Sequence, residues 1–189
     1  MHVARSSVKA DLMKSPCWGL AIAREHAHRL LAQADRRRIA RELVDALSTT
    51  DPEQRVRAAD VARRIAEKDA GFLVAHAAEL AVILAEIPIS ASRTRWHLGL
   101  VVARSARTSS DIRLAAEVLW QLADDKSNVV RPSAVEGLGL LARRDPALRS
   151  SVEPFLHQAL ITGTPAMRVR ARNALCWLQS GASSKRRRI

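Results

Sequence analysis

Apolar residues recur every three or four positions along the chain, and proline, glycine and capping residues divide the pattern into pieces of helical length. Three boundaries carry the same signal, a capping side chain followed by proline, at Asp51-Pro52, Asp145-Pro146 and Thr164-Pro165. Strand-like segments are absent between these pieces. We therefore predict an all-α fold with helices at about 17–32, 35–47, 53–67, 71–87, 91–106, 110–124, 128–144, 147–161 and 165–179.

Every second predicted helix, from the third onward, repeats one pattern. An arginine is followed by apolar residues three, seven and ten positions later, except that Ser105 takes the last place in the second set. The four arginines are separated by 40, 36 and 37 residues and are Arg55, Arg95, Arg131 and Arg168. Helix pairs that recur at this period are typical of α-solenoids, in which each pair buries its apolar face against its neighbours.

The stretches DPEQRVRAADVARRI at 51–65 and SNVVRPSAVEGLGLLARRDPAL at 127–148 resemble the second helix and following turn of HEAT-like repeats. The resemblance covers about residues 35–179. It implies a right-handed α-solenoid of about four helical hairpin repeats, preceded by one extra helix, with the second helices lining the concave side. We expect a flexible basic segment at 1–15, a repeat domain at 16–179 and a disordered basic tail at 180–189, which has too little apolar surface to be ordered.

Composition and charge narrow the class of protein. Aromatic residues make up only 3% of the chain and tyrosine is absent, as in helical proteins rich in alanine and leucine. The two cysteines are too far apart in sequence for a disulfide framework or a close-set metal site. No run of about 20 apolar residues could span a membrane. We expect a cytoplasmic protein with no membrane partner.

The sequence has no catalytic or cofactor-binding motif in the structural context that such a motif needs. GLGLLA at 137–142 matches a dinucleotide-binding pattern, but it falls inside a predicted helix instead of after a strand, so it indicates close helix packing. His26 and His28, two positions apart, project to nearly opposite sides of a helix and cannot share a metal ion. We expect no catalytic residue, no metal, no cofactor and no small-molecule substrate.

The distribution of charge favours an interaction module. The net charge is +12, of which the basic tail supplies +4 and residues 1–15 supply +2. We expect the concave face to bind an acidic protein segment or nucleic acid through Arg55, Arg95, Trp96 and Arg131. The same arginines have an alternative role, a structural ladder that binds turn carbonyls or aspartates such as Asp125. A contact with nucleic acid or another polyanion is expected at the C-terminal end, from Arg168, Arg170, Arg172, Lys185, Arg186, Arg187 and Arg188.

One enzymatic alternative remains open. Trp120 and Asp124 are four residues apart, and HEAT-like DNA-alkylation-repair glycosylases carry a tryptophan and an aspartate at this spacing in their site. In the repeat register the pair falls on a first helix, which the resemblance places on the convex side. The expected function is therefore non-catalytic binding, with the glycosylase as the alternative.

Overall fold

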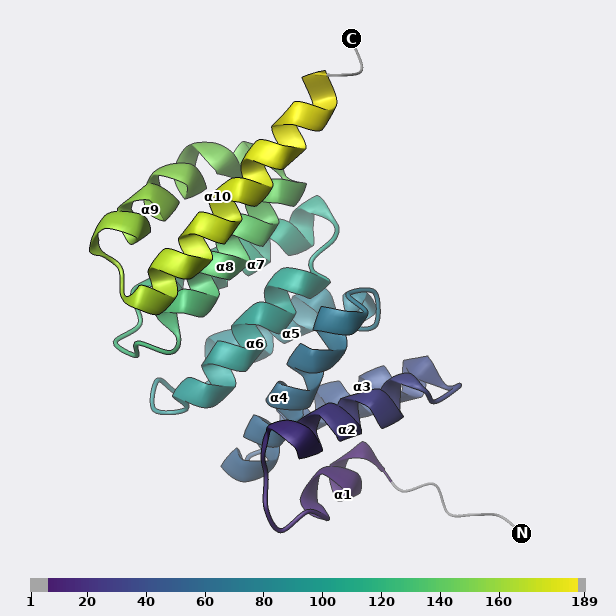
Figure 1. Ribbon diagram of the computed structural model, residues 1–189. Coiled ribbons are helices and arrows are strands. Elements are labelled where there is room, and N and C mark those ends of the chain that lie inside the picture. Colours follow the sequence, from purple (N-terminus) through teal and green to yellow (C-terminus); the bar gives the residue numbers. More distant parts are fainter. Residues whose placement is uncertain (1–6, 187–189) are drawn as a thin grey trace.

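The structure is a computed structural model that describes residues 7–186, with side chains to residue 180, and Figure 1 shows its helices. Within these residues the regular elements are all helical, as the sequence predicts. They are α1 (Val8–Met13), α2 (Leu20–Leu31), α3 (Arg36–Leu47), α4 (Pro52–Lys68), the 3₁₀ helix η1 (Val74–His76), α5 (Ala77–Glu86), α6 (Ser92–Ser105), α7 (Ser109–Ala123), α8 (Arg131–Arg144), the 3₁₀ helix η2 (Pro146–Leu148), α9 (Arg149–Thr162) and α10 (Pro165–Arg186).

The three predicted aspartate or threonine caps form the expected contacts. Asp51 Oδ1 accepts hydrogen bonds from the backbone N–H groups at the start of α4, the shorter at 2.9 Å from Glu53. Asp145 Oδ1 accepts one from Ala147 at 3.0 Å and begins η2, and Thr164 Oγ1 accepts one from Met167 at 3.3 Å. Each cap binds N–H groups that have no partner within the helix, which fixes where the helix begins.

The helices form two layers (Figure 1). In one layer the even-numbered helices contact one another in succession: α2, α4, α6, α8 and α10. In the second layer α1 contacts α3, and α5 contacts α7. Each of the helices α3, α5, α7 and α9 also packs on the helix that follows it. Four pairs of helices therefore follow α1 and α2. The sequence predicted one extra helix before the pairs, and the structure has two.

Helix α1 differs from the prediction of a flexible segment at 1–15. Val8 and Leu12 are buried, and α1 packs against α3 and α4. The backbone N–H of Val8 donates to Glu42 Oε2 at 2.8 Å, and Arg57 Nη1 donates to the carbonyls of Leu12 and Ser15 at 3.0 and 2.8 Å. Six residues are too short a stretch to show helical periodicity, so the sequence pattern did not reveal this helix.

Small residues let α8 approach its neighbours closely. A Cβ on Gly137 would lie 2.9 Å from Leu119 Cδ1 of α7, and a Cβ on Gly139 would overlap Ala174 Cβ of α10. Neither glycine has a positive φ, so what each site requires is the absence of a side chain. This confirms the prediction that GLGLLA serves helix packing.

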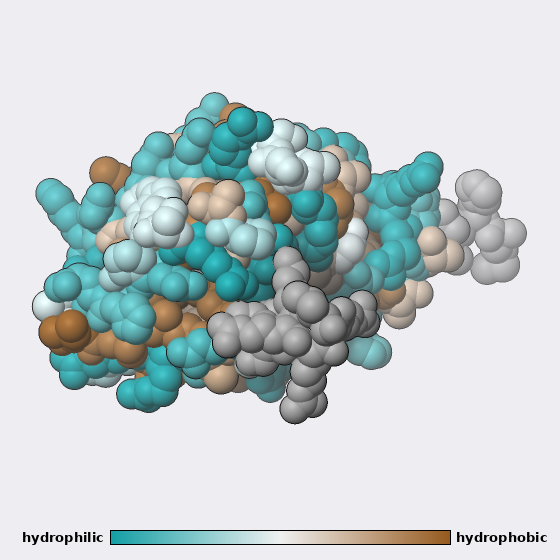
Figure 2. All heavy atoms as spheres, turned by 90° about the horizontal axis from the view of Figure 1, so that it is seen from above, coloured by the Kyte–Doolittle hydropathy of each residue, from teal (hydrophilic) through white to brown (hydrophobic). Residues whose placement is uncertain are grey.

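The C-terminal helix α10 continues to Arg186, beyond its predicted end at 179. Lys185 and Arg186 lie on this helical backbone, whereas Arg187 and Arg188 lie outside the described residues. The disorder expected for 180–189 stays a prediction for the residues beyond the helix. None of the helices within 7–186 combines the length and the hydropathy of a membrane span. The face seen in Figure 2 is mostly hydrophilic, with apolar residues in small groups.

Candidate functional site

The repeated arginines bind the turns that precede their own helices. Arg55 donates from Nε and Nη2 to the carbonyl of Thr49, at 2.9 and 2.6 Å. Arg168 donates from Nε to the carbonyl of Gly163 at 2.9 Å. In both cases the guanidinium satisfies a carbonyl in the turn that ends the preceding helix. These are the contacts of the structural ladder that the sequence allowed for.

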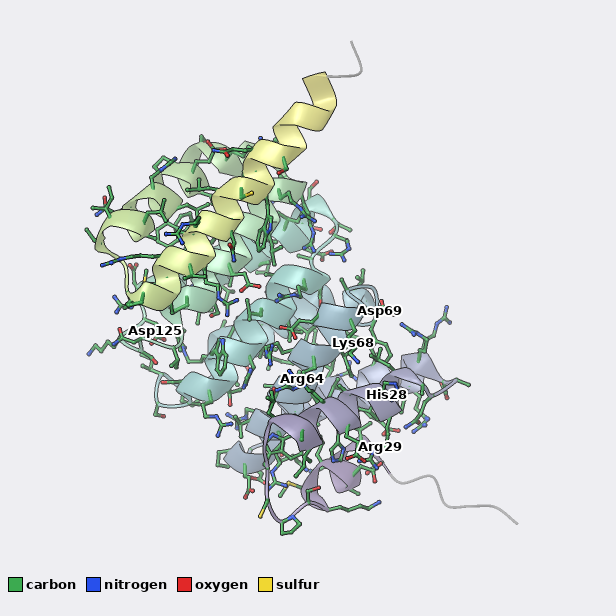
Figure 3. The ribbon with its side chains drawn as sticks, viewed as in Figure 1. His28, Arg29, Arg64, Lys68, Asp69 and Asp125 are labelled. Atoms are coloured by element: carbon green, nitrogen blue, oxygen red, sulfur yellow. The ribbon has the colours of Figure 1, made fainter. Side chains whose placement is uncertain are left out.

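Arg95 adds a bond to the next repeat. Its Nη1 donates to the carbonyl of Ile87 at 3.0 Å, while Nε and Nη2 lie 2.9 and 2.8 Å from Asp125 Oδ2. Asp125, labelled in the turn before α8 in Figure 3, has a side chain only 1% exposed. Arg131 donates to the side chain of Asn128 in the same turn. The repeated arginines thus bind groups in turns, and a role for them in binding a partner stays a prediction.

A network of paired charges runs across α4, α6, α8 and α10. On α4, Arg63 pairs with Glu67 and lies 3.5 Å from Asp60, and its Nε donates to His97 Nδ1 of α6 at 3.0 Å. Arg64, labelled on α4 in Figure 3, pairs with the same Asp60 carboxylate, with Nε and Oδ1 3.0 Å apart. Asp60 therefore balances two arginines in a largely buried setting.

Glu136 of α8 joins the other two helices to this network. Arg104 Nη2 of α6 donates to Glu136 Oε1 at 2.7 Å, and Arg170 of α10 pairs with Glu136 Oε2. The Glu136 side chain is 6% exposed, so its charge depends on these partners. Arg170, predicted to contact a polyanion, is consequently already paired.

Charges on separate helices of this layer act on one another. Burial lowers the pKa of Arg104, an effect that Glu67 opposes and Arg63 reinforces. Burial also lowers the pKa of Arg170, with Arg104 next in importance, and Glu67 and Arg63 again contribute. Charges of α4, α6 and α10 therefore influence one another across this layer.

Trp96 lies beside the network. Its ring stacks on that of His97 with centroids 4.2 Å apart, and the Arg63 guanidinium lies 5.9 Å from its centroid. Burial lowers the pKa of His97 to about 4, against the opposing charge of Asp60. His97 is therefore neutral at pH 7 and free to accept the hydrogen bond from Arg63 through Nδ1. The half-buried Trp96 ring provides a flat apolar surface at the edge of the charge network.

The remaining predicted residues are dispersed. Arg168 and Arg172 of α10 are exposed while Arg170 is half-buried, so the three do not form one row. Trp120 of α7 meets the Phe155 ring edge-on at 5.0 Å, and Asp124 is exposed at the end of the same helix. Among the residues that the structure describes, His, Cys, Asp and Glu form no group of three or more that could hold a metal ion.

Sequence reasoning named Arg170 as a site residue but missed the other members of the charge network. One signal was available, because Glu136 is an acidic residue between apolar neighbours on a helix with a buried face. Comparison with known proteins gives no match to any family model, curated protein or solved structure.

Proposed function

We propose that the protein is a non-catalytic interaction module of the HEAT-like α-solenoid type. The support for this architecture is a period of about 37 residues in the sequence together with even-numbered helices that contact one another in succession. Solenoids of this type bind partners along a concave surface to which each repeat contributes side chains. The concave face of α4, α6, α8 and α10 is the proposed binding surface.

The partner that fits this surface best is an acidic protein segment. The main support is an imbalance of charge in the network. Among the described residues, four arginines of α4, α6 and α10 share three carboxylates of α4 and α8. A carboxylate from a partner would complete the pairing in a site already shielded from water. The carboxylates on this face would repel a continuous phosphate backbone, which carries a charge about every 1.7 Å in duplex DNA. Trp96 would hold an apolar side chain of the same segment.

Fluorescence polarisation with a library of labelled 12-residue acidic peptides would test this proposal. Peptides with spaced glutamates are compared with matched peptides that carry glutamine, at two salt concentrations. We expect the best acidic peptide to lose roughly tenfold in affinity, or about 1.4 kcal/mol, with either Arg170→Gln or Trp96→Ala. Arg113→Gln, at an exposed position on α7, is the control and should bind as the unaltered protein does. Equal binding of glutamate and glutamine peptides would overturn the proposal.

Nucleic acid is the second candidate partner, because α10 carries no acidic residue and exposes Arg168 and Arg172. Contacts with phosphates would be independent of sequence and sensitive to salt, with a slope of about 0.9 in log affinity against log salt for each phosphate. Duplex DNA and single-stranded RNA are titrated with the intact protein, a truncation after Ala182 and the triple Arg168, Arg170, Arg172→Ala variant. Equal binding by all three, or none at low salt, would remove this candidate.

A further inference from the structure

A cavity of about 560 Å³ opens between α3 and the segment 71–76, outside the concave face. Its apolar lining comes from Ala40, Phe72 and Ala75. Small-molecule sites usually have volumes of about 300–1,000 Å³ and combine an apolar lining with a few convergent polar groups. The cavity has the size of such a site, although the sequence predicted no small-molecule substrate.

The cavity is held open by bridging side chains. Extensive contact between α3 and α5 is missing from the described part of the second layer, and Arg41 of α3 reaches Glu79 of α5 across the space. Two parallel bonds of 2.7 and 2.8 Å join the guanidinium to the carboxylate. The hydrogen bond from Arg41 lowers the pKa of Glu79, so the pair stays charged at neutral pH. A bidentate pair fixes the spacing of the two helices, which keeps the cavity formed without a ligand.

The basic rim of the cavity includes one arginine that has no partner among the residues that the structure describes. Arg36 pairs with Asp69, labelled at the end of α4 in Figure 3, and its guanidinium lies 4.7 Å over the Phe72 ring. Arg41 is occupied by Glu79. Arg37 also lines the cavity, is exposed, and has no hydrogen bond or ion pair with the residues described. Arg37 is therefore the arginine of this rim that is available to pair with a negative group.

We propose that this cavity binds a small aromatic anion. The planar apolar body of the ligand lies against Ala40, Phe72 and Ala75, and its carboxylate, sulfonate or phosphate pairs with Arg37. The Arg36 guanidinium, already stacked on Phe72, offers a second planar surface for an aromatic ring. The site is separate from the concave face, so it does not depend on the function proposed above.

The experiment uses 8-anilinonaphthalene-1-sulfonate, an aromatic anion whose fluorescence rises in apolar surroundings. We expect saturable binding to one site on the full chain. Arg37→Glu should weaken this binding at least tenfold, and Ala75→Trp should abolish it by filling the cavity from an exposed position. Arg113→Glu, which makes the same charge change on α7, should bind as the unaltered protein does. The neutral analogue N-phenyl-1-naphthylamine should bind at least tenfold more weakly.

Far-UV circular dichroism checks that each variant is folded. If Ala75→Trp does not fold, Arg37→Glu alone tests the proposal. The proposal is overturned if the anion fails to bind the unaltered protein, if Arg37→Glu binds it as tightly as the Arg113→Glu control does, or if the neutral analogue binds equally well.

Discussion

Substituting Gly139 with alanine tests the close approach of α8 and α10. The added Cβ would overlap Ala174 Cβ and would also lie 3.5 Å from the Ala174 Cα, so a rotation of one side chain cannot relieve the clash. Helix α10 must move instead, and its contacts with α8 are extensive. The substitution therefore strains the packing of the last pair of helices against the rest of the array.

Two opposing effects set the magnitude. Alanine favours a helix over glycine by about 0.8–1 kcal/mol. Added volume in a well-packed core costs about 1–3 kcal/mol. The balance predicts a net loss of up to about 2 kcal/mol in the free energy of unfolding. For a chain of this length the midpoint of thermal unfolding should fall by up to about 8 °C.

Urea unfolding followed by circular dichroism at 222 nm measures this change. Gly99→Ala is the matched control, because its nearest contact would be the Ser133 Oγ at 3.2 Å, without the overlap that a Cβ on Gly139 would meet. We expect that variant to be unchanged or slightly more stable. Adding Ala174→Gly to Gly139→Ala removes the overlap, and the double-mutant cycle should show a favourable coupling of at least about 0.5 kcal/mol. A Gly139→Ala protein as stable as Gly99→Ala would refute the argument.

Three further predictions concern buried polar groups. Arg95→Ala leaves the buried Asp125 carboxylate without its partner, so urea titration should show a loss of about 3–5 kcal/mol. His97 has a pKa of about 4 when folded and about 6.5 when unfolded, so its stabilising contribution is complete above pH 6.5 and lost as the pH falls towards 4. Thermal unfolding between pH 7 and 4 should therefore depend less on pH in His97→Gln. Glu136→Gln removes a charge that Arg104 shares, so acidic peptides should bind roughly threefold more tightly by fluorescence polarisation, with a steeper salt dependence.

Local features of the sequence predicted the helices well, and contacts between distant residues were not accessible to the same reasoning. Asp51 and Thr164 cap helices through atoms two or three residues away, a distance that a short motif specifies. The bond between Arg63 and His97 joins residues 34 positions apart, and it depends on how α4 and α6 rotate against each other. Apolar periodicity gives the buried face of each helix but not the pairing of side chains at its edges.

The cavity beside α3 illustrates the same limit. The sequence predicted a helix from residue 71, whereas α5 begins at Ala77, after a turn and the 3₁₀ helix η1. That longer connection lies beside α3, where Arg41 meets Glu79 in place of close helix contact. Gly71 signals a break in the helix, but the sequence does not show where the released segment will lie.

The contacts of α1 also constrain the order of events while the chain is being synthesised. Arg57 is added 45 residues after Leu12, the residue whose carbonyl it binds. At about 5–20 residues per second, this interval lasts about 2–9 s. During the first part of it Val8 and Leu12 lack both helices that pack on α1, so they are open to a chaperone. Helix α1 can contact α3 before α4 is made but completes its contacts only afterwards, so the helix that is translated first is the last of these three to be fully packed.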